Sequence, residues 1–341
     1  MKKPLLLPTF LCTLLCSFSL ASGASALPSI ERLAPELDSL IPPGAQVETL
    51  AEGFDWSEGP VWYQNRVLFS DVPENTVFQW APGDSKATVF LRPSGTISPV
   101  SDVKKQGSNG LTLDSSGRLV LCQHGERRIA RLEPDGTQTP LASQFEGKRF
   151  NSPNDLAYSN QGDLYFTDPP YGLDPAQRAQ LQELPFSGIY RLRKTGETDL
   201  LDKSLSFPNG IAFSPDESRL YVAVSDPAHP RIVAFQITRE GLLQNPQTFF
   251  DAVPLKEAGR KGSCDGLKVD THGNLFATGP GGVLVLSSEG KHLGSILTGQ
   301  ATGNCCWGGN GSELYITADM YLLRVRTLTR GSHLPPSISQ R

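Results

Sequence analysis

The sequence predicts an all-β fold and, within that class, a six-bladed β-propeller. The first observation is a repeat: six segments begin with a polar residue that carries a side-chain oxygen, then continue with an apolar run, a turn and a second apolar run. We call these first residues the leaders; they are Glu58, Asn109, Asn154, Asn209, Asp265 and Asn304. The second observation is their spacing of 39 to 56 residues, which suits a blade of four short strands.

Each repeat has the composition of β-strands. A leader opens a run such as NGLTLD or NDLAYS, and a second run such as RLVLC or DLYFTD follows a turn rich in Gly, Asn or Asp. The best helical pattern covers 174–185, inside an insertion at 168–188 that we expect to act as a lid or specificity loop. A pair of β-sandwiches is the alternative fold, but it would not place six leaders in one register.

A propeller ring is closed when both chain ends contribute to one blade. We therefore expect the segment 45–52 to pair with the last blade near 321–327. The innermost strands of all blades run in the same direction around a central channel, so the six leaders should meet at one mouth of that channel. An alternative reading is that the Asn-Gly and Asp-Gly pairs are only turn dipeptides.

The leaders predict a site for a hard cation. Glu58 and Asp265 carry carboxylates, and the other leaders offer amide oxygens. Such oxygen ligands suit calcium, magnesium or manganese better than a soft metal, although zinc also accepts them. We expect one divalent ion, with calcium as the first choice.

Length and charge limit the possible functions. The chain has 341 residues and a net charge of −4, with 19% charged residues, which suits one large domain without a basic face for nucleic acid. Lys2 and Lys3, an apolar stretch and small residues at 24–26 predict a secretory signal over 1–26. We expect a periplasmic or secreted protein with no membrane association after cleavage, a propeller over 27–330 and a flexible tail over 331–341. Oligomeric state cannot be deduced from the sequence.

Four of the six cysteines remain after cleavage at this signal. They are Cys122, Cys264, Cys305 and Cys306. Export permits a disulfide bond, but the sequence does not select a pairing.

Several segments resemble one known family. They are SEGPVW (57–62), GSNGLTLD (107–114), NSPNDLAYSNQGDLYFTDPPYGL (151–173), FPNGIAFSPDESRLYVA (207–223) and DGLKVDTHGNLFATGPGGV (265–283). The chain is similar to the gluconolactonase and regucalcin family, also called the senescence-marker-protein family, and its TDPPYGL form resembles the bacterial gluconolactonase branch. This resemblance implies a six-bladed propeller lactonase with one divalent cation at the channel mouth.

The resemblance also implies residue roles. Glu58, Asn209 and Asp265 would bind the cation, and Asn154 matches a further asparagine near metal and substrate. Arg149 corresponds to an arginine that contacts substrate in regucalcin-like members.

Further residues near the expected mouth are candidates for contact with substrate. Asn109 and Asn304 would hold substrate or water, or only close turns. Asp155 is a candidate too, although a structural hydrogen-bond role is favoured for it. His124 follows a strand of the second repeat, and Tyr171 begins the insertion.

The chemistry that suits such a site is hydrolysis of a cyclic ester. The cation would polarise the lactone carbonyl, and Asp265 would be the base that activates water, with a hydroxide at the cation as the alternative. A serine esterase is excluded because the GxSxG motif is absent. We expect a small sugar lactone as substrate. Two alternatives stay open: a propeller hydrolase of arylesters or phosphotriesters, and a non-catalytic propeller that binds a glycan or a protein.

Overall fold

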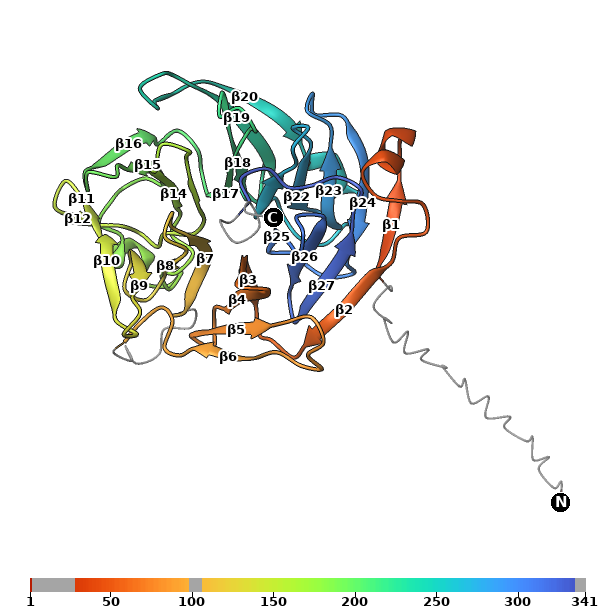
Figure 1. Ribbon diagram of the computed structural model, residues 1–341, viewed down its shortest axis with the longest axis horizontal. Helices are drawn as coiled ribbons and strands as arrows, with labels where there is room; N and C mark the ends of the chain where they lie inside the picture. Colours follow the sequence, from red (N-terminus) through yellow and green to blue (C-terminus); the bar gives the residue numbers. More distant parts are fainter. Residues whose placement is uncertain (2–27, 98–105, 335–341) are drawn as a thin grey trace.

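A computed structural model of the protein describes residues 1, 28–97 and 106–334. Six antiparallel sheets are arranged as blades around a central axis (Figure 1). The predicted six-bladed propeller is therefore confirmed. The signal predicted over 1–26 lies almost entirely outside the described residues, as do residues 335–341.

The blades follow one another in chain order, and in the first five the innermost of the four strands comes first; in blade six the outermost strand, β2, comes from the N-terminal part of the chain. Blade one contains β3 (Ser57–Tyr63), β4 (Arg66–Asp71), β5 (Thr76–Trp80) and β6 (Thr88–Leu91); blade two contains β7 (Ser108–Leu113), β8 (Leu119–Gln123), β9 (Arg128–Leu132) and β10 (Gln138–Ala142); blade three contains β13 (Leu156–Tyr158), β14 (Leu164–Asp168), β15 (Gly188–Leu192) and β16 (Thr198–Asp202). Blade four contains β17 (Pro208–Phe213), β18 (Arg219–Val224), β19 (Arg231–Ile237) and β20 (Leu243–Asp251); blade five contains β21 (Leu267–Val269), β22 (Leu275–Gly279), β23 (Gly282–Leu286) and β24 (His292–Leu297); blade six contains β25 (Asn304–Gly308), β26 (Glu313–Ala318), β27 (Tyr321–Arg326) and β2 (Val47–Glu52). Outside this scheme are β1 (Ser29–Arg32), the hairpin β11 (Gln144–Phe145) and β12 (Lys148–Arg149), and the short helices η1 (Pro35–Ser39), α1 (Arg178–Leu181) and α2 (Val253–Glu257).

The ring closes through blade six. Strand β2 pairs antiparallel with β27, with Val47 opposite Val325 and Glu52 opposite Tyr321. Glu48 adds a charged contact, because Arg324 Nη2 donates to its Oε2 at 2.6 Å. The expected pairing of the two chain ends is confirmed.

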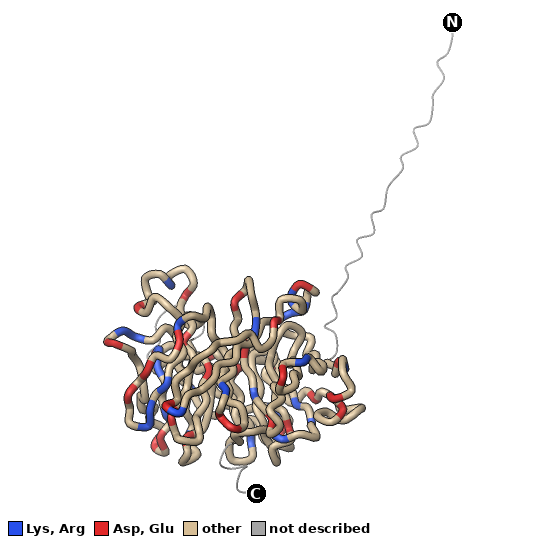
Figure 2. The backbone as a smooth tube through the Cα atoms, turned by 90° about the horizontal axis from the view of Figure 1, so that it is seen from above, with Lys and Arg blue, Asp and Glu red and all other residues tan. Residues whose placement is uncertain are grey.

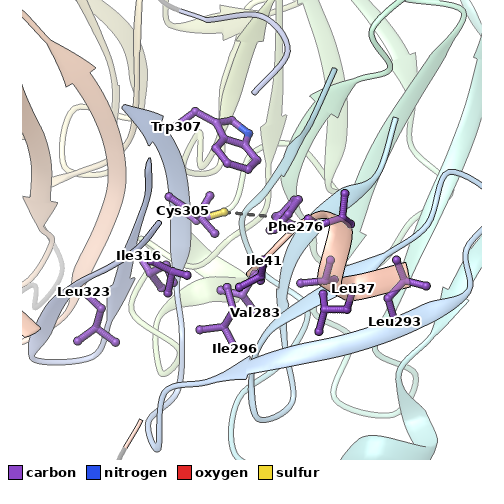
Figure 3. Close-up of a cluster of buried hydrophobic side chains, with 14 of the residues drawn as sticks. Leu37, Ile41, Phe276, Val283, Leu293, Ile296, Cys305, Trp307, Ile316 and Leu323 are labelled. Atoms are coloured by element: carbon purple, nitrogen blue, oxygen red, sulfur yellow. Dashed lines mark hydrogen bonds between the residues drawn. The ribbon is translucent and has the colours of Figure 1, made fainter. Parts of the chain in front are cut away.

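Blade five has an additional strand that the repeat pattern does not predict. Strand β1 pairs antiparallel with β24, so that this sheet has five strands. The helix η1 follows, and Leu37 of this helix and Ile41 just after it are buried against blade five (Figure 3). Because an outermost strand otherwise exposes unpaired backbone groups, β1 protects the edge of β24.

The hydrophobic core lies between neighbouring blades. Figure 3 shows one such cluster, in which Phe276 and Val283 of blade five face Cys305, Ile316 and Leu323 of blade six. Each sheet therefore buries both faces, which explains why its inner strands are continuous apolar runs.

The four cysteines in the described part of the chain are buried and free, so no disulfide forms among them. Cys305 and Cys306 point to opposite faces of blade six, as neighbours on a strand do, and they join different core clusters. Burial between blades, rather than pairing, is the role of these residues.

Two predictions about irregular segments need adjustment. The helix expected over 174–185 is limited to the single turn α1, which buries no residue and so lacks the packing that stabilises short helices. Residues 331–334, expected to belong to the tail, are packed instead: Gly331 N donates to Gly311 O at 3.0 Å, and Ser332 N and Oγ both donate to Val269 O at 2.9 Å. The packed chain therefore extends to Leu334.

Charge is distributed evenly over the propeller. Positions of Lys and Arg are interspersed with those of Asp and Glu along the described part of the tube (Figure 2). None of the helices in the described residues has the length and hydrophobicity needed to span a bilayer.

Candidate functional site

The six leaders lie at the start of the innermost strands and are linked from blade to blade. Four of them are followed by glycine, and in each case the missing side chain makes room for the next blade. A Cβ atom would come within 2.1 Å of Asn109 O if placed on Gly59, 2.5 Å of Asn154 O on Gly110, 2.2 Å of Asp265 O on Gly210 and 1.9 Å of Asn304 Cγ on Gly266. These glycines thus serve the close approach of strands around the channel, not the turn dipeptides of the alternative reading.

Irregular strand pairing accompanies three leaders. The register between the first two strands of a blade shifts after Glu58, after Ser108 next to Asn109, and after Pro208 next to Asn209. A bulge changes the direction of a side chain and ends regular pairing. It therefore allows these leaders to turn toward the channel mouth.

Hydroxyl groups on second strands fix the leaders of the following blade. Ser70 Oγ donates to Asn109 O at 2.8 Å, and Thr167 Oγ1 donates to Asn209 O at 2.6 Å. Asn154 is held through its backbone, because its N–H donates to Thr167 O and its carbonyl accepts from Gly110 N. The ring of leaders is therefore a rigid unit.

Two aspartates shape the chain just before a leader. Asp71, at the end of β4, accepts two backbone N–H bonds of 3.1 and 3.2 Å from residues that precede Glu58. Asp168, at the end of β14, accepts two backbone N–H bonds, both of 2.8 Å, from residues that precede Asn154. Burial raises the pKa of Asp168 to about 7.

Two leaders have amide oxygens that lack a partner. Among the described residues, Asn109 Oδ1 and Asn209 Oδ1 are buried and accept no hydrogen bond. Asn209 is only 4% exposed, and its Nδ2 donates to Ser225 Oγ at 2.9 Å, which fixes the orientation of the amide. Because an unpaired buried oxygen is costly, these atoms mark a place for a ligand.

Glu58 is almost fully buried in the same ring. Its Oε2 accepts a hydrogen bond from Gly59 N at 2.9 Å. Burial raises the pKa of Glu58 to about 7, and the nearby charge of Asp155 acts in the same direction. A nearby cation would stabilise the carboxylate form.

Asp155, Asn304 and Lys268 form a network across the channel, which we call the central network. Asp155 Oδ2 accepts bonds of 3.4 Å from Asn304 Nδ2, on the opposite blade, and from Ile211 N. Asn304 Oδ1 accepts from Cys305 N at 2.9 Å and from Lys268 Nζ at 3.4 Å. The hydrogen-bonding groups of Asn304 are thus used inside the protein, whereas Asn109 Oδ1 remains available.

The insertion after β14 covers part of the leader mouth. Tyr171 lies near Ser225, Asn209 and Asp265, and burial raises the pKa of its phenol. Asp265 itself is half-buried. His124 is buried against the insertion, because a Cβ on Gly172 would lie 2.8 Å from its Cβ and Cγ.

Arg149 lies on the hairpin β11–β12 with its side chain exposed. Its N–H donates to Glu183 Oε2 at 2.8 Å and its Nη2 to Glu126 O at 3.4 Å. No contact with a leader is present in the described part of the structure, so its role toward substrate stays a prediction. The neighbouring Arg127 is buried instead, and it ties the hairpin to the insertion through bonds to Phe150 O and Leu181 O.

Sequence reasoning missed Lys268 and Arg127. Lys268 belongs to the DGLKVD motif, and a lysine inside an apolar inner strand was the available signal. Arg127 gives no such signal, because it lies in a polar turn whose burial depends on the insertion.

A cavity of about 640 Å³ occupies the channel at the end away from the leaders, which we call the far mouth. Lys268, Trp307, Ser332 and His333 are among the lining residues, and no leader is. The leader mouth, by contrast, holds both leader carboxylates and the unpaired amide oxygens of Asn109 and Asn209. Within the described residues no group of three or more His, Cys, Asp or Glu could hold a metal, as expected for a ring that combines two carboxylates with amides.

Comparison with known proteins places this ring in a family. A family model described as the SMP-30/Gluconolactonase/LRE-like region matches residues 56–319. The chain belongs to this family. The matched segment contains all six leaders, and the resemblance stated from the sequence is confirmed.

Relatives in the SMP-30/gluconolactonase family cover most of the chain. A gluconolactonase from Zymomonas mobilis subsp. mobilis is 39% identical over 323 residues, which are 91% of this chain and 89% of that protein. The structure of a gluconolactonase from Xanthomonas campestris has a TM-score of 0.76 and 33% identity, covering 88% of this chain and 97% of that one. A calcium-binding regucalcin from Agrobacterium tumefaciens shares the fold, with a TM-score of 0.67 and 18% identity over 85% and 97% of the two chains.

Proposed function

We propose that this protein is a metal-dependent lactonase that opens sugar lactones to aldonic acids. The observation that carries the proposal is the leader ring, where two carboxylates and unpaired buried amide oxygens meet at one mouth of the channel. Its family membership and its likeness to gluconolactonases over most of the chain support the same activity.

One divalent cation would be held by Glu58, Asn154, Asn209 and Asp265. The donor set consists of oxygens only, which suits calcium, with magnesium, manganese or zinc as alternatives. The fit is supported by Asn209 Oδ1, which is buried and has no partner in the described residues. A bound cation would polarise the carbonyl of the lactone as a Lewis acid.

Asp265 is the proposed general base. It is half-buried at the leader mouth, where water and substrate would approach it. Asp265 takes a proton from the water molecule while the water oxygen attacks the carbonyl carbon of the lactone. The ring C–O bond then breaks, and the proton passes to the alkoxide that leaves, which yields the open hydroxy acid.

Groups around the leader mouth would orient the substrate. Asn109 Oδ1 can accept a hydrogen bond from a sugar hydroxyl, since it has no partner in the described structure. Tyr171, which lies near Ser225 and Asn209, would close one side of the mouth. We further propose, from the signal predicted over 1–26, that the mature enzyme acts in the periplasm or outside the cell.

The test is acid release from δ-gluconolactone by purified protein lacking residues 1–26. We expect hydrolysis that a chelator abolishes and a divalent cation restores. Asp135→Asn, which changes a carboxylate in an exposed turn, is the matched control. It should lose activity with the chelator and regain it with the cation, as the wild-type protein does. Faster turnover of an arylester or phosphotriester than of any aldonolactone would contradict the lactonase proposal, as would glycan or protein binding without lactone hydrolysis.

A further inference from the structure

Two aromatic residues stack beside the leader mouth, and we call them the aromatic pair. Tyr171 lies in the insertion after β14, and Phe207 directly precedes β17. Their ring centroids are 5.7 Å apart with an interplanar angle of 27°. Both residues are half-buried, so part of the pair is open to a ligand.

The aromatic pair is tied to the residues proposed to carry the chemistry. Phe207 is two positions before Asn209, and Tyr171 lies near Asn209 and within the electrostatic reach of Asp265. Ser225 joins both parts, because its N–H donates to Phe207 O at 3.1 Å while its Oγ accepts from Asn209 Nδ2 at 2.9 Å. The pair therefore has a fixed position relative to the leader ring.

The backbone of Phe207 is in an unfavourable conformation. Its φ of 51° lies in the left-handed region, and it is the one apolar side chain among the non-glycine residues with positive φ in the described chain. A bulky residue rarely adopts this conformation, and the following Pro208 disfavours it further. Such strain is concentrated at functional sites, where the surrounding structure maintains it.

We propose that an outer face of the Tyr171–Phe207 stack binds one face of a six-membered sugar lactone. The C–H bonds on a face of the sugar ring carry partial positive charge, which the negative face of an aromatic ring attracts. The hydroxyl groups at the edge of the ring would then be directed toward polar leaders such as Asn109. This inference rests on the proposed lactonase function and names Phe207 as a residue that determines specificity.

The test compares ring-removing and ring-preserving substitutions. Phe207→Leu and Tyr171→Leu should each raise KM for δ-gluconolactone about three- to tenfold while kcat changes less than about twofold. Phe207→Tyr retains a flat ring and should recover most of the lost affinity. The double Leu variant should cost less than the product of the two single effects, because both residues form one surface.

Phe90→Leu is the matched control. Phe90 is also half-buried and packs on a tyrosine, Tyr63, with ring centroids 5.8 Å apart, but it lies on the outermost strand of blade one. This variant should lower the melting temperature to a similar extent as Phe207→Leu and leave KM unchanged.

Binding is measured separately by calorimetry with a cyclic sugar analogue that lacks the carbonyl oxygen. The two Leu variants should weaken its binding to the same extent as they raise KM. The inference would be overturned if Phe207→Leu kept the KM and the analogue affinity of the wild-type protein. It would also be overturned if Phe90→Leu lost as much affinity as Phe207→Leu. If the wild-type protein hydrolyses no lactone, the proposed function fails instead, and the analogue still reports on the surface.

Discussion

The two mouths of the channel are built from the same inner strands, yet they differ in chemistry. At the leader mouth the strands begin with bulges and with close contacts between blades that only glycine allows. The side chains there are carboxylates and amides. At the far mouth the same strands end in ordinary turns around an open cavity that Ser332 and His333 help to line. The candidate site is therefore defined by buried polar atoms that lack hydrogen-bond partners, and not by the volume of a cavity.

The central network explains how the two mouths remain separate. Asp155 and the leader Asn304 meet across the channel, and Lys268, which donates to Asn304, also lines the cavity of the far mouth. The positive charge of Lys268 lies near the buried carboxylates of Glu58 and Asp155, and it limits the repulsion between them. Changes at the leader mouth should thus affect catalysis, and changes at the far mouth should affect stability.

The largest expected effect is that of Asp265→Asn at the leader mouth. The amide cannot take a proton from water, so kcat should fall about 10²- to 10⁴-fold while the protein stays folded. Initial rates of acid release and a thermal melt measure the two properties. Asp135→Asn should retain the wild-type rate, and an Asp265→Asn enzyme with most of its turnover would show that another group is the base.

Next in size is the effect of pH on cation affinity. The pKa of Glu58 is raised to about 7 without a cation, so below pH 7 its carboxyl is protonated and a binding cation must displace that proton. Affinity should therefore fall about tenfold for each pH unit below 7 and level off above it. Calorimetric titration in buffers of different ionisation enthalpy measures the released proton. In Glu58→Gln the affinity should be weak and independent of pH; an unchanged slope in this variant would refute the assignment.

A smaller effect is expected for Gly210→Ala. The new methyl group would lie 2.2 Å from Asp265 O, so blades four and five must move apart, at a cost of about 1–3 kcal/mol in the free energy of unfolding. The same movement displaces Asp265, so kcat should fall as well. Gly44→Ala is a useful comparison, because its Cβ meets no atom within 4 Å and only its positive φ is unfavourable. If the two variants had equal kinetic constants, the contact between the strands at Gly210 would not be needed for catalysis.

The smallest effect belongs to the far mouth. Ser332→Ala removes the two hydrogen bonds of Oγ, to Val269 O and with His333 Nδ1, and should lower the free energy of unfolding by about 1–2 kcal/mol without changing kcat or KM. Urea unfolding and initial rates measure both, with the exposed Ser115→Ala as the matched control at the same mouth. A kinetic defect in Ser332→Ala would mean that the two mouths are coupled.

The repeat made the fold and the leader ring predictable from sequence. A fixed register of polar leaders determines the number of blades and brings Glu58 and Asp265 to one mouth, because every innermost strand starts there. Strand β1 was not predictable in this way, since it lies outside the repeat and pairs with a strand far along the chain. The positive φ of Phe207 depends on contacts with Ser225 and Tyr171, and local sequence preference points to an extended conformation instead.

The contribution of β2 to blade six has a consequence for folding. Residues 47–52 pair with residues 321–326, so the contact joins positions near opposite ends of the polypeptide. Blade six cannot be completed until the ribosome has synthesised β27, and until then β2 has no partner in its native sheet. Ring closure must therefore be among the last steps of folding, and a nascent chain of this protein stays open until its synthesis is nearly finished.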